Sequence, residues 1–301
     1  MTWVPPDAGA ATVPPPRPLE QWRPVEAPGA ARPRLAPMTA MEILDGGFAI
    51  LRRAPATILG ITAAFVVPVH AVGAWLGRGE EGLDVDAVLE QSDTTLSLGA
   101  AGVSDSAAAV LQVGPMIALV FVAAAIARLV SAWQVGHDLG TGELVRITLG
   151  RSWALLASWV LVHLLELVAV LGIVLPLAVM TWFLVTAPVI GAEGLGPVAA
   201  MRRSARLASR RFWMVLGLAL LGFLVEQLFE SAIGMVPILV SAVVGTEGAL
   251  WVLPGVAGIL TSLVTVPVVA GITVLIYLDL RVRTEGLDLE LDLVDAFPSA
   301  T

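Results

Sequence analysis

Five polar side chains interrupt long apolar runs in the second half of the chain, and their types could do chemistry: His163, Glu166, Glu226, Gln227 and Glu230. An ionisable group inside a membrane costs at least ~2.5 kcal/mol unless it is paired or hydrated, so such groups often have a function. His163 and Glu166 are three residues apart and Glu226 and Glu230 are four apart, so each pair shares a helix face. Together they could hold a proton or a cation.

The two groups lie at a similar depth when each helix is counted from its expected inner end, Trp153 or Phe212. At ~1.5 Å per residue, Glu166 lies ~20 Å along its helix and Glu226 ~21 Å along its own. This depth is in the outer half of a bilayer. If the second helix ends near Glu230, the acids reach the outer headgroups and need no function. A purely structural role, with bonds across the helix bundle, is the interpretation we favour.

A second candidate site is an arginine cluster between two apolar runs: Arg202, Arg203, Arg206, Arg210 and Arg211. An apolar stripe at ~100° per residue leaves most of these arginines on the other side of one amphipathic helix. Such a face predicts contact with anionic lipid, at ~1 kcal/mol per Arg. Two alternatives stay open. The arginines only set the topology, or they pair with the acidic residues that follow Arg283.

No other chemistry is indicated. The chain has no Cys, which excludes disulfides, thiolate chemistry and Cys-ligated metals. Nucleotide loops, zinc-protease motifs, nucleophile elbows and nucleic-acid signatures do not occur, so we expect no enzymatic activity, no cofactor, no metal and no nucleic-acid partner. His70, near Pro68, is predicted at a membrane interface.

Membrane-spanning helices must position these residues. Apolar residues make up 57% of the chain, and runs of about 20 residues are long enough to cross the ~30 Å hydrocarbon core. The runs lack the alternation of barrel strands, which leaves helices as the spanning structure. Gly172 and Pro176 predict a tight reversal within the longest run. We predict an all-α integral membrane protein with six transmembrane helices, at about residues 56–76, 107–127, 153–173, 174–192, 212–232 and 256–278.

Polar segments surround the predicted membrane domain, which covers residues 38–283. Residues 1–37 hold ten of the twenty Pro and are predicted to form a disordered cytoplasmic tail. Residues 77–106 form an acidic outer loop, and residues 284–301 form an acidic cytoplasmic tail.

Arginines orient the predicted spans. All seventeen basic residues are Arg, and they gather at alternate ends of the apolar runs, whereas the opposite loops are mainly acidic. By the positive-inside rule we expect both chain ends in the cytoplasm. We expect the protein to lie in the cell membrane.

Three amphipathic segments on the cytoplasmic side each precede a predicted hairpin: Thr39–Arg53, Gly142–Arg151 and Pro197–Phe212. Thr39 and Glu42 fit a capping box at the start of the first one. This order predicts three repeats of an interfacial helix plus a transmembrane hairpin, or a convergent topology without repeats.

Small side chains permit helices to approach each other closely. Alanine fills four of the five positions 123–127, and Gly217 and Gly222 interrupt the fifth predicted span. Small residues let two helix backbones come together, although they do not specify the partner helix.

Three segments carry a family resemblance: Met41–Phe48 followed by Arg52 and Arg53, Arg202–Ser204 running to Arg211–Trp213, and Tyr277–Asp288. Together they resemble actinobacterial multi-pass proteins labelled "glycerophosphoryl diester phosphodiesterase membrane domain", over about residues 38–293. The resemblance implies a membrane domain that some relatives join to a phosphodiesterase barrel. The hydrolase pattern of that barrel has no matching positions here, so the resemblance implies no catalytic residue.

We therefore expect a non-enzymatic membrane scaffold or accessory module that contacts anionic lipid, or membrane and cytoplasmic protein partners. One alternative is a transporter or channel-like carrier that uses the intramembrane acids as a proton or cation relay. A second alternative, which follows from the resemblance, is an accessory domain for a lipid- or glycerophosphodiester-related enzyme.

Overall fold

The structure is a computed structural model of the chain, and it describes residues 36–77, 105–170, 172, 174–244, 252–289 and 291. Within these ranges every regular element is a helix, and six stretches are long and apolar enough to cross a membrane, as predicted. Most of the predicted tails and outer loop (residues 1–35, 78–104 and 292–301) lies outside the described residues.

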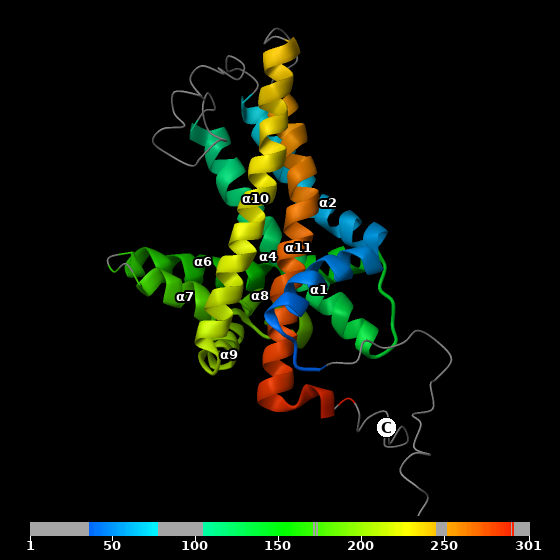
Figure 1. Cartoon of the computed structure of the whole chain (residues 1–301), viewed down its shortest axis with the longest axis vertical. Helices are drawn as coiled ribbons and strands as arrows, with labels where there is room; N and C mark the ends of the chain where they lie inside the picture. Colours follow the sequence, from blue (N-terminus) through cyan, green and yellow to red (C-terminus); the bar gives the residue numbers. More distant parts are fainter. Residues whose placement is uncertain are drawn as a thin grey trace, which may run out of the picture. The chain divides into compact units, whose positions relative to one another are not determined.

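The apolar stretches are α2 (Pro55–Leu76), α4 (Asp105–Gln134), α6 (Ser152–Ala169), α7 (Leu175–Phe183) with α8 (Thr186–Glu193), α10 (Phe212–Val244) and α11 (Val252–Glu285) (Figure 1). α10 has 33 residues and α11 has 34. At ~1.5 Å per residue each is ~50 Å long, so both helices extend past a ~30 Å hydrocarbon core.

A short amphipathic helix precedes each of three apolar hairpins: α1 (Ala40–Arg53), α5 (Thr141–Leu149) and α9 (Pro197–Ser209). The capping box of α1 is confirmed, because the Thr39 hydroxyl accepts the Glu42 N–H at 3.3 Å and the Glu42 carboxylate accepts the Thr39 N–H at 2.7 Å. The backbone hydrogen bond from Thr39 also lowers the pKa of Glu42 below its ordinary value. The element order therefore fits both predicted alternatives, three repeats and a convergent topology without repeats.

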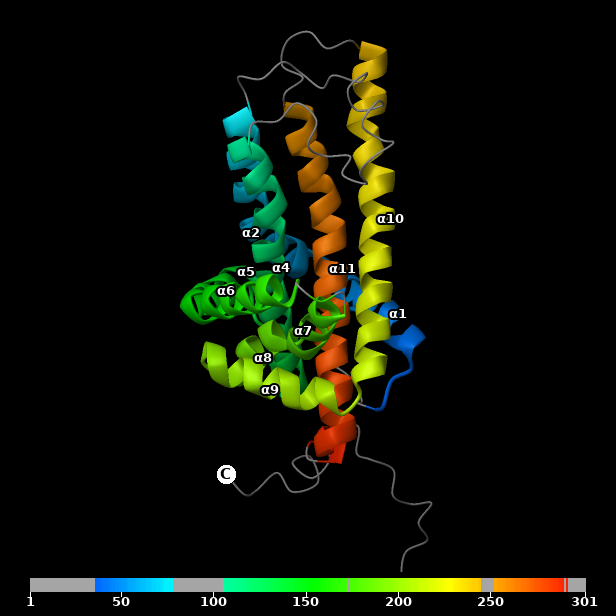
Figure 2. The ribbon, with the colours of Figure 1, turned by 90° about the vertical axis from the view of Figure 1, so that its left-hand side faces the viewer.

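The middle hairpin departs from this pattern. The predicted fourth span is two helices, α7 and α8, which are separated at Leu184 and Val185. α6 and α7 run across the direction of α10 and α11 in two perpendicular views (Figures 1 and 2). Trp182 of α7 contacts both α9 and α10. Its carbonyl accepts a hydrogen bond from the Ser204 hydroxyl of α9 at 2.8 Å, and its ring contacts Phe212 at the start of α10. These contacts hold α7 in this position.

The core forms around α11, which packs against α1, α2, α4 and α10. Two crossings have almost no space between backbones. A Cβ on Gly191 of α8 would lie 2.1 Å from the carbonyl oxygen of Ala124 in α4, and Gly47 of α1 faces Gly271 of α11 in the same way. The predicted contact role of the alanine run is thus confirmed.

The glycines of α10, which also permit a close contact, make none with another described helix. No described atom outside the helix itself lies within 4 Å of where a Cβ on Gly217 or Gly222 would be placed. A small residue therefore lies at a close helix crossing only where the fold packs a second helix against it.

Candidate functional site

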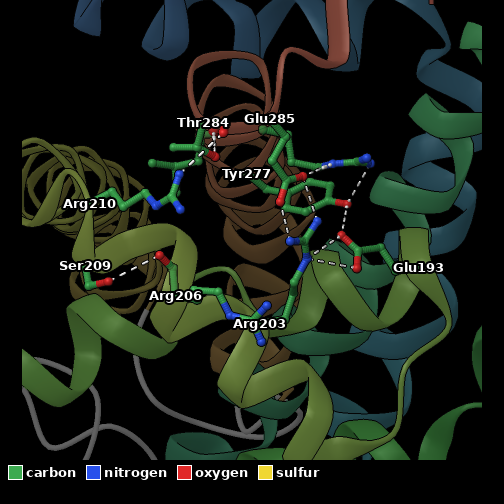
Figure 3. Close-up of polar contacts among 10 residues, drawn as sticks. Glu193, Arg203, Arg206, Ser209, Arg210, Tyr277, Thr284 and Glu285 are labelled. Carbon is green, nitrogen blue, oxygen red and sulfur yellow. Dashed lines mark hydrogen bonds and ion pairs between the residues drawn. The ribbon is translucent and has the colours of Figure 1, made fainter. Parts of the chain in front are cut away.

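Polar side chains from three helices meet where α8 ends, α9 passes and α11 reaches its C-terminal turns (Figure 3). We call this group the polar junction; its members are Glu193, Arg203, Tyr277, Arg281 and Glu285. Gly194 positions Glu193, because it ends α8 in the left-handed conformation with φ 67°. The proline at the first position of α9 then starts the helix that carries Arg203.

Arg203 bridges two carboxylates. Its Nε donates to both oxygens of Glu193 at 3.1 Å, and its two Nη atoms donate to Glu285, with Nη2 2.7 Å from Oε2. The Arg203 side chain is 18% exposed. The hydrogen bonds to Glu285 are the main reason why the pKa of Arg203 lies above its ordinary value, so the guanidinium stays charged.

Tyr277 and Arg281 complete the junction. The buried Tyr277 hydroxyl donates to Glu193 at 2.9 Å and accepts from Arg281 Nη1 at 3.3 Å. Arg281 Nε donates to Glu285 at 3.2 Å. Two guanidinium groups therefore balance two carboxylates, and the junction joins α8, α9 and α11 without a net charge.

A second polar contact joins α11 to the residues before α1. The Asp279 carboxylate is fully buried, and it accepts the Met38 N–H at 2.8 Å and Arg283 Nε at 2.9 Å. Arg283 Nη2 in turn donates to the Met38 carbonyl at 2.8 Å. The closed ring of bonds fixes the Arg283 guanidinium and anchors the start of α1.

The substitution Asp279→Asn is expected to lower the free energy of unfolding by about 2 kcal/mol, because hydrogen bonds to a charged partner contribute more than neutral ones. The asparagine amide would present an N–H donor to the Met38 N–H or to Arg283, both of which are donors themselves. It would also remove the negative charge that balances the Arg283 guanidinium. Thermal unfolding in detergent, followed by tryptophan fluorescence, measures the change. Asp288→Asn is the control, and an equal loss of stability in both variants would contradict this role of Asp279.

The arginine cluster divides into two kinds of residue. Arg203 points into the polar junction, whereas Arg202, Arg206 and Arg210 are exposed and Arg211 is half-buried. The ion pair between Arg203 and Glu285 agrees with the predicted alternative in which the arginine cluster pairs with the acidic residues after Arg283. Among the described residues, no ion pair involves the other arginines of the cluster.

A cationic groove lies beside the junction. It has a volume of about 590 Å³ and is lined by Pro37, Arg210, Arg211, Arg283 and Thr284. Among the described residues, the Arg210 guanidinium makes one hydrogen bond, a long one of 3.4 Å to the Thr284 carbonyl. Since Asp279 balances Arg283, the net positive charge of the groove comes from Arg210 and Arg211.

The predicted intramembrane acids lie in two separate helices. On α6, His163 Nδ1 donates to the Trp159 carbonyl at 2.9 Å, and Nε2 is 3.9 Å from the Glu166 carboxylate. The second group, Glu226, Gln227 and Glu230, is on α10. No hydrogen bond or ion pair joins the two groups in the described part of the chain, because α6 runs across α10 (Figure 1).

His70 is packed inside the protein. Its ring is buried between α2 and α11, where Nε2 lies 3.0 Å from the Ser262 hydroxyl. Gly258 makes room for the ring, since a Cβ there would lie 2.6 Å from ring atoms. The ring therefore lies in a helix–helix contact, and its predicted depth at a membrane interface stays a prediction.

Sequence reasoning missed several residues of these contacts: Glu193, Tyr277, Asp279, Arg281 and Arg283. A signal was present in α11. Tyr–Arg, Asp–Arg and Arg–Glu pairs follow one another at spacing i,i+4, which places each pair on one helix face. Within the described residues, no group of three His, Asp or Glu side chains is placed to hold a metal ion.

The chain matches no protein-family model, no curated protein and no solved structure. The family resemblance therefore stays a prediction. Its three segments nevertheless meet in space. Met41–Phe48 packs on α11 at the Gly47 crossing, and Arg203 of the second segment binds Glu285 of the third. Two of these segments thus supply Arg203, Tyr277, Arg281 and Glu285 of the polar junction, whereas Glu193 lies outside all three.

Proposed function

We propose that this protein is a non-enzymatic scaffold of the cell membrane, and that α9 binds anionic lipid headgroups on the cytoplasmic side. The observation that supports this most is the exposure of Arg202 and Arg206, which have no ion-pair partner among the described residues. In contrast, their neighbour Arg203 is held in the polar junction.

The orientation of α9 suits such a contact. Its buried residues include Met201, Leu207 and Ala208, which attach the helix to the protein. Arg202 and Arg206 are four residues apart and share the opposite face. Near an anionic leaflet each is worth ~1 kcal/mol, an attraction that salt weakens.

Contacts between the arginine-rich segments support one common side for them. Arg53 at the end of α1 lies 4.6 Å from the Trp133 ring near the end of α4. Arg151, before α6, donates to the carbonyl of Gly194. By the positive-inside rule this side is the cytoplasm, which also gives cytoplasmic chain ends.

The double variant Arg202→Gln/Arg206→Gln tests the proposal. The protein is reconstituted in phosphatidylcholine proteoliposomes that contain spin-labelled phosphatidylglycerol. At low salt, the association of this lipid with the double variant is expected to be about tenfold weaker than with the wild-type protein. Each removed arginine contributes ~1 kcal/mol of attraction to the lipid, and the remaining salt screens part of it. Electron paramagnetic resonance measures the immobilised lipid fraction.

Arg146→Gln, which removes an exposed arginine from α5, is the matched control for a general change of charge. Unchanged phosphatidylglycerol association in the double variant, or an equal loss in the control, would count against α9 as the lipid-binding surface.

A further inference from the structure

The cationic groove is an open depression on the surface that brings together arginines from separate parts of the chain, whereas the exposed arginines of α9 lie on one helix. Its arginines come from different places in the chain: Arg210 and Arg211 from the turn between α9 and α10, and Arg283 from the last turn of α11.

Arg283 is oriented in advance. Its Nε is bound to Asp279 and its Nη2 to the Met38 carbonyl, and Nη1 has no hydrogen bond among the described residues. A guanidinium fixed in this way loses little side-chain freedom when a ligand arrives. The buried Asp279 thus acts as a positioning residue for the groove.

The remaining two arginines supply the unbalanced charge. Arg211 is half-buried. In the part of the chain that the structure describes, Arg210 has only its 3.4 Å bond to the Thr284 carbonyl, which a stronger acceptor can replace. Guanidinium groups bind phosphate oxygens in pairs of parallel hydrogen bonds. Two positive charges without an ion-pair partner among the described residues match a phosphomonoester, which carries about −1.5 to −2 at neutral pH, better than a singly charged phosphodiester.

We propose that the groove lined by Arg210, Arg211 and Arg283 binds the phosphate group of a phosphomonoester, carried by a lipid headgroup or by a soluble molecule. This inference rests on the proposed lipid-binding side of the protein and adds headgroup selectivity to it. The exposed pair Arg202 and Arg206 attracts any anionic lipid, whereas the groove selects among them.

The test uses the full chain in phosphatidylcholine nanodiscs that contain spin-labelled phosphatidic acid or phosphatidylglycerol. The wild-type protein is expected to associate about tenfold more strongly with phosphatidic acid, the phosphomonoester, because one further charge-assisted contact is made. Arg210→Gln/Arg211→Gln should remove this preference. Arg211→Lys, which keeps the charge but not the paired donors, should reduce it and serves if the double variant does not fold.

Arg202→Gln/Arg206→Gln is the matched control, since it should weaken association with both lipids and retain the preference. Unchanged association in this control overturns the proposed function without touching the groove. Equal association of the wild-type protein with both lipids, or a preference that survives Arg210→Gln/Arg211→Gln, overturns the phosphomonoester site.

Inorganic phosphate distinguishes the two sources of the ligand. Displacement of phosphatidic acid by inorganic phosphate supports the site and identifies a soluble phosphate as a competent ligand. Preference without displacement supports the site and assigns it to a lipid headgroup.

Discussion

Replacing Arg203 by Met is expected to lower the melting temperature of the detergent-solubilised protein by about 5–10 °C, which corresponds to roughly 2–3 kcal/mol. The substitution leaves the carboxylates of Glu193 and Glu285 facing each other without the guanidinium that separates them. Removing one partner of a fully buried pair costs about 3–5 kcal/mol, and the partial exposure of these side chains reduces that figure. Tryptophan fluorescence during heating measures the change.

A double-mutant cycle identifies the cause. Glu285→Gln removes one of the two negative charges, so it should destabilise the wild-type protein but restore part of the stability of the Arg203→Met variant. Arg206→Met, three residues further along the same helix and exposed, is the control and should have little effect. Additive losses in the cycle would show that Arg203 contributes packing rather than charge pairing.

The partners of Arg203 explain why the sequence alone could not separate it from its neighbours. The arginine cluster is uniform in residue type, and Glu193 and Glu285 are 10 and 82 residues away in the chain. One hint was available. Arg203 is three residues after Ala200 and four before Leu207, which are both buried, so the helix period placed it beside the buried face.

Local features of the fold were predictable because they depend on a few consecutive residues. Apolar runs of sufficient length identified the spanning stretches, and Thr39 with Glu42 identified the start of α1. The direction of α6 and α7 was not predictable in this way. Hydrophobicity sets the length of a helix, but long-range contacts such as Ser204 with Trp182 set its angle.

The same limit affected the intramembrane acids. The depths of Glu166 and Glu226 were counted in residues from Trp153 and Phe212. The two counts give the same depth in the membrane only if both helices run parallel. α6 runs across α10, so equal positions along the two helices are not equal positions in space (Figure 2). Residue spacing within a helix was reliable, as the contact between His163 and Glu166 illustrates, because it needs no knowledge of other helices.

Gly191→Ala is expected to destabilise the protein by about 3 kcal/mol, a large effect for one added methyl group. The new Cβ would lie 2.1 Å from the carbonyl oxygen of Ala124 and 2.7 Å from its carbonyl carbon. Backbone atoms cannot rotate away as a side chain does, so α8 must separate from α4. Val185, Val189 and Ile190, which are fully buried, would then lose part of their packing.

Gly217→Ala is the matched control, because it makes the same chemical change in the second turn of α10, where no described atom outside the helix lies within 4 Å of the new Cβ. Alanine is favoured over glycine inside a helix by up to ~1 kcal/mol, so this variant should be neutral or more stable. Melting curves and size-exclusion profiles of both variants measure the contrast. The two substitutions are thus expected to have opposite signs; an equal effect would mean that the close crossing of α8 and α4 is absent, since helix propensity alone treats both positions alike.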